Sequence, residues 1–400
     1  MKGHYLPENW TVEKSQVYCA RVADGTHDTP KQVPEGKILV TSKNIKNGKV
    51  NFDGCYLISE NDYSQINKRS KVDKGDVLFS MIGTVGEIAF VDEEPSYAIK
   101  NIGLFKTKSF SDGKWLYYYL TSKIGQAALD TFLTGTSQQF VSLGDLRKVP
   151  VIRAPQKNQR KIAAVLSAYD DLIENNNRRI AILEKMAEEL YREWFVRLRF
   201  PGHEKTKIIK GVPNGWEVVP AGKYIKLVKG RSYTSEEIED YEATDNHNYF
   251  ITLKNFKRGG GYRADDKKYY CGKYNDNQVV SGGSLVVAVT DMTQDRAVIG
   301  EVARIPNEAI TKGIISCDVV KVEPVNISIS FLYASLRFSS YSKTLKEFAN
   351  GANVLHLKPE LATKQKVIIP PKDLRDRFDD AFVPLIESMD RLNPSSWFLP

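Results

Sequence analysis

The alternation of apolar and polar residues predicts a chain in which strands and helices are mixed. Val77–Ile82 and Ser284–Val289 are short β-rich runs that follow glycine turns, a pattern that favours strands. Lys114–Leu133 and Ser330–Phe348 carry apolar residues at three- and four-residue spacing, which predicts helices. The predicted fold class is therefore α+β.

A long uninterrupted helix is predicted after the proline-containing extended segment at residues 149–152. Gln156–Leu198 contains neither proline nor glycine. Its apolar positions recur at alternating steps of four and three residues: Ile162, Leu166, Tyr169, Ile173, Ile180, Leu183, Ala187, Leu190 and Trp194. This period is typical of a coiled-coil seam, although an ordinary amphipathic core helix is the alternative. Asn176 lies within the series, where it can fix the register, or Asn176–Arg179 can simply be a solvated stretch.

A second, shorter helix is predicted at Lys372–Leu392, after another extended segment. Pro384 lies inside it and is expected to kink or interrupt it. We expect Ile162–Ile173 to pair with Phe378–Met389 within the chain. The apolar residues of the long helix then left without a counterpart are Ile180, Leu183, Leu190 and Trp194. Since exposing large apolar side chains is unfavourable, this part is expected to pack on a partner protein or a second copy of the chain.

The chain repeats itself once. Matched segments are Trp10 with Trp216, Lys43–Lys46 with Lys254–Lys257, Gly86–Ala89 with Gly300–Ala303, and Gly135 with Gly351. The matches keep their order, and their separation drifts from 211 at Lys43 to 216 at Gly135, which indicates small loop insertions in the second copy. The repeat predicts four parts: a domain at residues 1–154, a long helix at 155–199, a second domain at 200–370 and a short helix at 371–400.

Composition and missing motifs narrow the chemistry. Apolar residues make up 42% and charged residues 26% of the 400 residues, which is ordinary for a globular protein without membrane spans. The net charge of +8 mildly favours a polyanionic partner. Four scattered cysteines and the absence of an apolar leader favour the cytoplasm. The sequence has no phosphate-binding GxxxxGK[ST] loop, no HExxH and no GxSxG, which favours a binding protein over an enzyme.

Several segments resemble the specificity subunit of Type I restriction–modification enzymes. They are Asp24–Pro30, Lys74–Phe79, Gly135–Gln139 and, most strongly, the stretch from Pro150 through Gln159, Asp170–Ile173 and Leu190. The resemblance covers essentially the whole chain. It implies two target-recognition domains, each reading one half of a split DNA sequence, with the helices acting as antiparallel spacer and docking surface.

The resemblance also implies partners and cofactors. Modification subunits would bring S-adenosylmethionine for adenine N6-methylation, and restriction subunits would bring ATP- and Mg²⁺-dependent translocation and cleavage, so this chain itself would bind no cofactor or metal. The residues expected to dock subunits are Ile162, Leu166, Tyr169, Ile173, Ile180, Leu183, Leu190, Trp194, Phe378 and Phe382. Self-association is a further possibility. The alternatives are a non-catalytic scaffold that joins two partners without reading DNA, and a self-contained nuclease or methyltransferase.

Candidate DNA-contacting residues follow from the chemistry of base and phosphate recognition. Asn and Gln form paired hydrogen bonds with adenine, whereas Lys and Arg bind phosphates or guanine. In the first half the candidates are Lys43, Asn44, Lys46, Thr136, Ser137, Gln138 and Gln139. In the second half they are Lys254, Asn255, Lys257, Arg258, Arg263 and Asn353. The alternative for each is a solvated turn.

Overall fold

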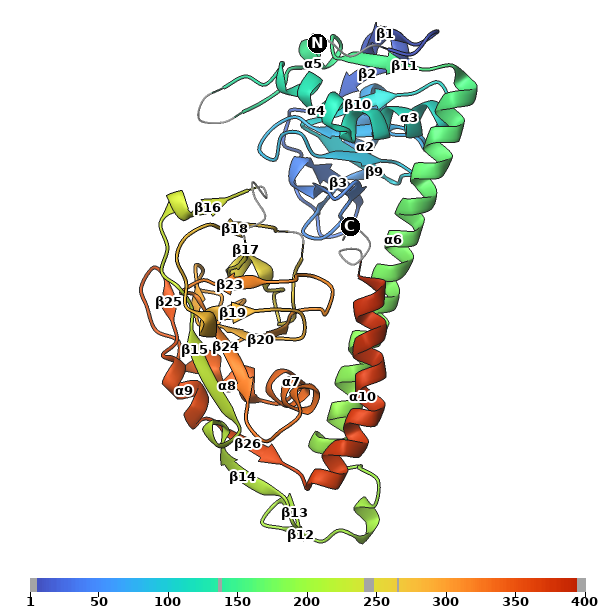
Figure 1. Ribbon diagram of the computed structural model, residues 1–400. Helices are drawn as coiled ribbons and strands as arrows, with labels where there is room; N and C mark the ends of the chain where they lie inside the picture. Colours follow the sequence, from blue (N-terminus) through green and yellow to red (C-terminus); the bar gives the residue numbers. More distant parts are fainter. Residues whose placement is uncertain (1–5, 136–138, 241–247, 265, 394–400) are drawn as a thin grey trace. The chain divides into compact units, whose positions relative to one another are not determined.

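The computed structural model describes residues 6–135, 139–240, 248–264 and 266–393. It divides into two compact units, Met1–Asp171 and Leu172–Pro400, and the division falls within one long helix, α6 (Gln156–Tyr191) (Figure 1). Each unit contains both helices and sheets, so the predicted α+β class is confirmed.

The first unit is built on two sheets. The antiparallel sheet has the order β2 (Arg21–Asp24), β10 (Ile102–Lys106), β7 (Val77–Ser80) and β8 (Ile88–Phe90). The mixed sheet has the order β6 (Tyr56–Ile58), β3 (Lys37–Thr41) and β9 (Tyr97–Lys100), with β3 parallel to β9. A separate pair joins β1 (Thr11–Lys14) to β11 (Pro150–Arg153), the strand that leads into α6. All four residues of β7 are buried, as expected for a strand with core on both faces.

The second unit repeats this plan. Its antiparallel sheet has the order β15 (Ile225–Lys229), β24 (Val319–Pro324), β20 (Leu285–Ala288) and β22 (Val302–Arg304). Its mixed sheet has the order β16 (Ile238–Glu239), β18 (Tyr269–Tyr270), β17 (Asn248–Ile251), β23 (Gly313–Ile315) and β19 (Val279–Val280), with β17 parallel to β23. The pair β14 (Glu217–Pro220) and β26 (Lys366–Ile369) leads into α10 (Lys372–Leu392). The repeat seen in the sequence is thus also a repeat of strand order and direction in the four-stranded sheet, whereas the mixed sheet keeps its parallel pair and has two further edge strands, β16 and β19.

The remaining elements are short. In the first unit they are α1 (Ser15–Tyr18), β4 (Ile45–Lys46), β5 (Lys49–Val50), α2 (Glu60–Ser70) and α5 (Leu143–Leu146). In the second they are β12 (Ile208–Ile209), β13 (Val212–Pro213), β21 (Thr290–Asp291), β25 (Leu355–His356) and α9 (Pro359–Lys364).

Each of the two helices predicted at Lys114–Leu133 and Ser330–Phe348 is in fact a pair of helices. The first is divided into α3 (Phe110–Thr121) and α4 (Lys123–Asp130), because Ser122 is extended and its side chain caps α4 by accepting from the Gly125 N–H. The second is divided into α7 (Ile329–Phe338) and α8 (Tyr341–Glu347) at Ser339 and Ser340. Serine side chains compete for backbone hydrogen bonds and so favour helix ends, a local effect that apolar spacing does not report.

The predicted pairing of the two long helices is wrong. Trp194, near the end of α6, contacts Phe378, near the start of α10, with 5.8 Å between ring centroids. At the other end, Ile180 and Met389 line the same pocket. The helices therefore run antiparallel, and α10 covers the second half of α6 rather than the first (Figure 1). The reason is the contact that brings β14 back to the end of α6: Trp216, just before β14, packs against Phe195, just after α6, with 5.8 Å between ring centroids. Since β14 pairs with β26, which leads into α10, α10 begins where α6 ends.

This pairing gives the second unit its core. Phe378 and Phe382 are fully buried and stacked, with 5.0 Å between their ring centroids. Leu190 and Trp194 pack against the same cluster, so they have a counterpart within the chain. Pro384 does not interrupt α10. Pro384 lies on the exposed side of the helix. Because proline has no N–H, the carbonyl of Asp380 receives no helical hydrogen bond, and Asp380 is also exposed.

Candidate nucleic-acid interface

Three loops of the second unit meet at one surface. They are the basic loop (residues 254–263), the anchored loop (residues 289–301) and the helix–strand loop (residues 350–354). Arg258 of the basic loop forms an ion pair with Asp295 of the anchored loop, at 3.1 Å between Nη1 and Oδ2. The Gln294 amide of the anchored loop donates to the Ala352 carbonyl of the helix–strand loop at 3.0 Å. Positions that lie far apart in sequence thus form one surface.

A buried carboxylate holds the anchored loop in shape. Asp291 is 2% exposed, and its Oδ1 accepts from the backbone and hydroxyl of Thr293 at 3.0 and 2.8 Å. Its Oδ2 accepts from the backbone N–H groups of Val298 and Ile299 at 2.8 and 3.2 Å. Burial by itself would raise the pKa of Asp291, but these hydrogen bonds outweigh it and hold the pKa below its ordinary value. The loop is therefore fixed at both ends by one charged group.

The equivalent loops of the first unit converge in the same way. Thr84 Oγ1, in the loop at residues 81–87, donates to the Ser42 carbonyl at 3.2 Å. Ile82 forms a bridge with Phe140, and the Val141 N–H donates to the Met81 carbonyl at 3.1 Å. In the second unit the corresponding contacts are the β21–β25 pair and a hydrogen bond of 2.8 Å from the Leu357 N–H to the Val289 carbonyl. Both units therefore bring the same three positions of the repeat together.

Two of the predicted base-contacting residues point inward. Asn44 is 2% exposed: its Oδ1 accepts from the Thr41 N–H at 3.0 Å and its Nδ2 donates to the Asp53 carbonyl at 3.3 Å. Asn255 is 3% exposed and makes matching contacts with Thr252 and Asp266 at 2.9 Å each. Both asparagines close a capping turn that shapes the loop. Their hydrogen-bonding groups are occupied, which is a physical reason to remove them from the base-contacting set.

The other candidates lie at the surface or outside the described residues. Those exposed in the first unit are Lys43, Lys46 and Gln139, and those exposed in the second are Lys254, Lys257, Arg258, Arg263 and Asn353. Thr136, Ser137 and Gln138 lie outside the described residues. Several of the exposed cations already have partners: Lys254 is 3.8 Å from Asp266, and Arg258 is paired with Asp295 as above.

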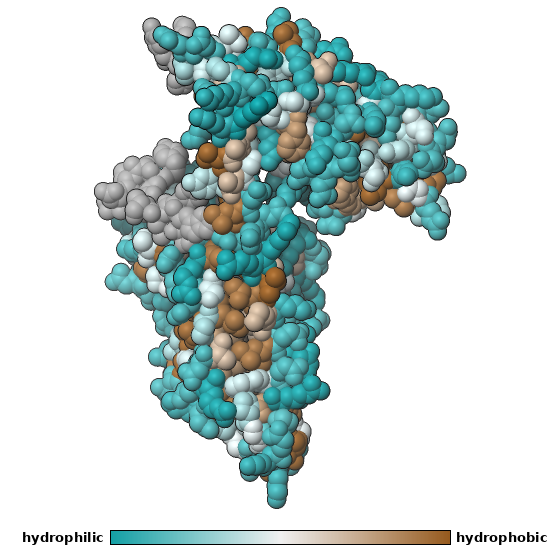
Figure 2. All heavy atoms as spheres, turned by 90° about the vertical axis from the view of Figure 1, so that its right-hand side faces the viewer, coloured by the Kyte–Doolittle hydropathy of each residue, from teal (hydrophilic) through white to brown (hydrophobic). Residues whose placement is uncertain are grey.

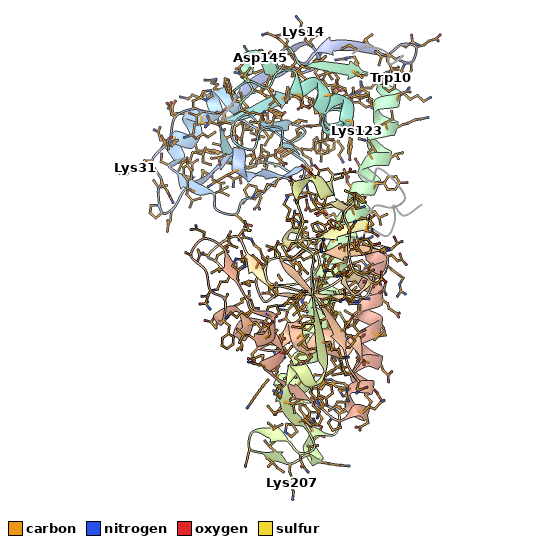
Figure 3. The ribbon with its side chains drawn as sticks, turned by 60° about the vertical axis from the view of Figure 1, so that its left-hand side comes forward. Trp10, Lys14, Lys31, Lys123, Asp145 and Lys207 are labelled. Carbon is orange, nitrogen blue, oxygen red and sulfur yellow. The ribbon has the colours of Figure 1, made fainter. Side chains whose placement is uncertain are left out.

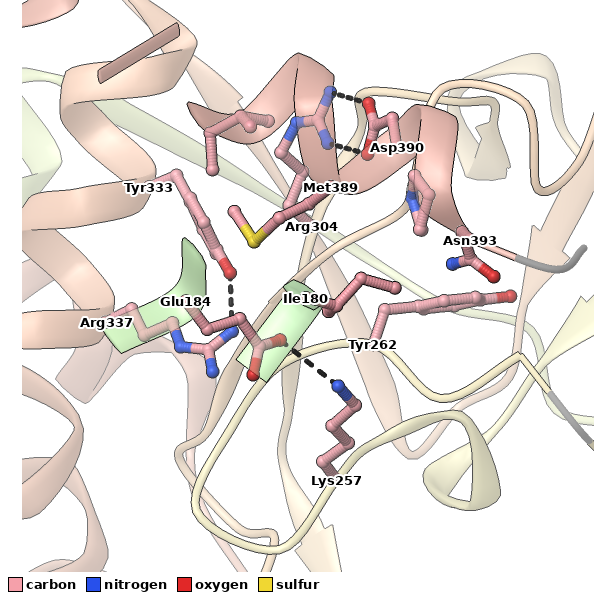
Figure 4. A pocket seen from close by; sticks show the side chains of 12 residues that line it. Ile180, Glu184, Lys257, Tyr262, Arg304, Tyr333, Arg337, Met389, Asp390 and Asn393 are labelled. Atoms are coloured by element: carbon pink, nitrogen blue, oxygen red, sulfur yellow. Dashed lines mark hydrogen bonds and ion pairs between the residues drawn. The ribbon is translucent and has the colours of Figure 1, made fainter. Parts of the chain in front are cut away.

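The basic loop is also tied to the helices (Figure 4). Lys257 Nζ lies 3.1 Å from Glu184 Oε1 on α6, so its charge is directed toward the helix. Nearby, Arg304 on β22 forms a two-pronged ion pair with Asp390 on α10, at 3.0 and 2.9 Å. Both side chains are nearly buried, 11% and 9% exposed. These contacts fix the three-loop surface of the second unit relative to the helix pair that carries it.

Sequence reasoning missed the anchored loop. The signal was available: the run Asp291–Arg296 is polar apart from Met292 and lies between a buried strand and the matched Gly300–Ala303 segment. It makes the loop longer than its counterpart at residues 81–87. Loop insertions in one copy of a repeat are a usual place for function.

Net charge alone does not locate the interface. Lys14, Lys31 and Lys123 are exposed at separate places on the first unit, and Lys207 is exposed near the β12–β13 hairpin of the second (Figure 3). Cationic side chains are thus spread over both units. The convergence of the loops is the more specific observation.

An apolar face follows the helices. Figure 2 looks onto the side formed by α6 and α10, where hydrophobic residues gather. On α6, the exposed apolar residues are Ile162, Val165, Leu166, Tyr169, Leu172, Ile182 and Met186. The exposed docking candidates are therefore those of the first half of α6, whereas Phe378, Phe382, Leu190 and Trp194 are covered within the second unit. Ile173, Ile180 and Leu183 are half-buried, and Asn176 is buried rather than solvated.

The described part of the chain has no cluster of metal ligands and no helix that could span a membrane. No three His, Cys, Asp or Glu side chains there come together as metal ligands. No described helix combines the length and the apolar composition needed to cross a bilayer.

The chain is similar to proteins named as Type I restriction enzyme specificity subunits. Residues 32–185 match the family described as Type I restriction modification DNA specificity domain. The chain is 25% identical to the Type I restriction enzyme MjaIX specificity subunit of Methanocaldococcus jannaschii, over 96% of this chain and 88% of that protein. It is 23% identical to the putative type I restriction enzyme MjaX specificity subunit of the same organism, over 57% of this chain and 56% of that protein.

A solved structure supports the fold. The S subunit of a Type I restriction–modification system from M. genitalium superposes with a TM-score of 0.56 at 17% identity, covering 97% of this chain and 93% of that chain. The resemblance to specificity subunits inferred from the sequence motifs is confirmed by the family match and by the relatives named above.

Proposed function

Because residues 32–185 carry a Type I restriction modification DNA specificity domain, we propose that this chain is the specificity subunit of a Type I restriction–modification system. It reads a bipartite DNA target and positions an adenine-N6 methyltransferase and, where present, an ATP-dependent restriction subunit. The observation that carries the proposal is the matching convergence of three loops in each unit. Two copies of one scaffold with different loops suit the reading of two different half-sites.

DNA contact is assigned to the exposed members of these loops. In the first unit they are Lys43, Lys46 and Gln139, and in the second Lys254, Arg258, Arg263 and Asn353. Lysine and arginine side chains on phosphates supply salt-dependent affinity, and amide groups supply base discrimination. Lys257 is assigned instead to holding the basic loop on α6, since its partner Glu184 belongs to that helix, whereas Arg258 pairs with Asp295 of the anchored loop and Lys254 lies 3.8 Å from Asp266, close to the basic loop.

The first half of α6 is the proposed docking face for modification subunits. Ile162, Leu166 and Tyr169 lie on one side of the helix at coiled-coil spacing and are exposed. Contiguous apolar residues on a long helix favour a protein partner over water. Leu166→Asp combined with Tyr169→Asp should abolish co-purification with the modification subunit, while Lys157→Asp, on an already polar part of the helix, should not. A second copy of this chain is the other possible occupant, which the mass of the purified chain alone would reveal.

This subunit carries no catalytic step in the proposal. S-adenosylmethionine, ATP and Mg²⁺ belong to the partner subunits, and a cytoplasmic location stays a prediction. The deciding experiment maps N6-methyladenine in DNA exposed to this chain together with its modification subunit. The expected result is one split sequence with a fixed spacer. A scaffold that does not read DNA would give no sequence-dependent methylation change and no salt-dependent duplex binding when this chain is added.

A further inference from the structure

The anchored loop of the second unit holds one large apolar side chain out in water. Met292 is 68% exposed, and its neighbours on the loop are polar. Single exposed apolar residues are common on protein surfaces, so exposure by itself identifies nothing. The position of Met292 within the loop and the residues around it are what give it meaning.

The backbone on either side of Met292 is fixed before any ligand arrives. Asp291, which precedes it, is buried and accepts hydrogen bonds from Thr293, Val298 and Ile299. Gln294 and Asp295 then tie the loop to its two neighbours. Because the backbone of this loop is already ordered, a contact made by one of its side chains costs rotamer entropy but little backbone entropy. Such preorganisation suits a contact that selects among ligands.

The space next to Met292 has apolar walls and matched charges. An open cavity of about 570 Å³ is lined by Met292 and the rings of Tyr233 and Phe250, and also by two lysines and three carboxylates: Lys254, Lys268, Asp240, Asp266 and Asp318. Each lysine lies beside a carboxylate of this lining, Lys254 beside Asp266 and Lys268 beside Asp240. Tyr233 is itself 41% exposed and packs edge-on against Phe250, with 4.8 Å between ring centroids. Because the lysines are matched by carboxylates, the distinctive feature that this rim offers a ligand is an apolar contact.

A thymine in duplex DNA offers an apolar group for such a contact. Its C5 methyl group projects into the major groove, beside the phosphates of its own strand, and it is the apolar mark that distinguishes thymine from the other bases there. We propose that Met292 contacts the methyl group of one thymine in the second half-site and so helps to set its sequence. The inference rests on the proposed function and adds a specificity-determining residue to it.

The test removes the methyl group and the side chain in turn. The target is first defined by methylation mapping, and each of its thymines is then replaced by deoxyuridine in synthetic duplexes. Binding is measured with the complex of this chain and its modification subunit, carrying Met292, Met292→Leu or Met292→Ala. At one thymine of the second half-site, deoxyuridine should weaken binding about fourfold for Met292 and for Met292→Leu, the equivalent of ~0.8 kcal/mol for one methyl-sized group. For Met292→Ala the same replacement should change binding less than twofold.

Thymines of the first half-site are the internal control. Replacing any of them with deoxyuridine should change binding by the same factor in all three variants. The slope of log K against log salt should be the same in all three variants, because no phosphate contact changes. The inference is overturned if no thymine of the second half-site shows this coupling. It is also overturned if Met292→Ala impairs assembly with the modification subunit in the absence of DNA, which would assign the side chain to a protein contact. Failure of the whole complex to select a sequence would instead refute the proposed function.

Discussion

The two units share one scaffold and differ in what they place on it. The loop at residues 81–87 is short and turns through Gly83 and Gly86, both with positive φ, so it offers little side chain to a ligand. Its counterpart at residues 289–301 is longer and presents Met292, Gln294 and Arg296 around a buried carboxylate. Loop length and loop chemistry can thus change while strand order stays the same, which is what a reader of two unlike half-sites requires.

The supports beneath the loops differ too. Phe90 pairs with Val77 in the first unit, and Arg304 pairs with Leu285 at the equivalent place in the second. Phe90 packs against Phe110, with ring centroids 5.1 Å apart, whereas Arg304 is bound to Asp390 of α10. The first unit is therefore held at this point by apolar packing and the second by a nearly buried ion pair. The comparison leads to four predictions, in order of expected effect.

Exchanging the first domain should change the target most. Replacing residues 1–154 with the corresponding domain of a known specificity subunit should replace one half of the methylated sequence and leave the other half and the spacer unchanged. The physical reason is that each unit has its own core and its own three loops. Methylation mapping is the measurement. A change in both halves would show that the units do not read independently.

Breaking the buried ion pair should destabilise the second unit. Arg304→Met leaves Asp390 nearly buried without its partner, which typically costs about 3–5 kcal/mol. Denaturant unfolding should show a lower free energy of unfolding. The double variant Arg304→Met with Asp390→Leu should recover most of the loss, because it no longer has an unpaired, nearly buried carboxylate. Phe90→Leu in the first unit is the matched control and should cost less. Equal unfolding free energies for the Arg304→Met variant and the unaltered chain would contradict the role given to this pair.

Removing the loop anchor should act on one half-site only. Asp291→Ala leaves the buried N–H groups of Val298 and Ile299 without an acceptor, at about 1–3 kcal/mol for each such group. Discrimination at the second half-site should fall, and discrimination at the first should not.

The lowered pKa of Asp291 adds a pH signature to the same prediction. Because its folded-state pKa lies below the ordinary value of about 3.9, the ionised group stabilises the fold above that pH, and this stability is lost as pH falls through the lowered pKa. Asp291→Asn keeps the shape without the charge. The stability difference between Asp291 and Asp291→Asn should therefore shrink on acidification below about pH 4. A difference that grew instead would contradict the hydrogen-bonded carboxylate.

Phosphate contacts should give the smallest and most symmetric effects. Lys43→Ala and Lys254→Ala occupy matched positions of the repeat, and each should lower the magnitude of the log K against log salt slope by ~0.9. Lys257→Ala is the contrasting variant, because its ammonium faces Glu184, and its slope should stay near that of the unaltered chain. If Lys257→Ala lowered the magnitude of the slope as much as Lys254→Ala, Lys257 would also be a phosphate contact.

Much of this protein can be read from local pattern. The α+β class, the internal repeat, the long α6 helix and the loops that carry Arg258 and Asn353 follow from hydrophobic period, glycine turns and matched segments. Such features depend on residues a few positions apart, or on similarity between two stretches of one chain. Both can be recognised in the amino-acid sequence. The resemblance to specificity subunits has the same origin.

Other features depend on which distant segments meet, and these the tertiary structure decided. The sequence allows α10 to lie on either half of α6, and the β14–β26 pair selects the second half by placing the start of α10 beside the end of α6. Asn44 has the same chemistry whether it caps a turn or reads adenine, and its burial decides between them. Asp291 becomes an anchor because folding brings the N–H groups of Val298 and Ile299 to its carboxylate. Side-chain identity fixes what a residue can bind, and long-range packing fixes whether that capacity faces the core or the solvent.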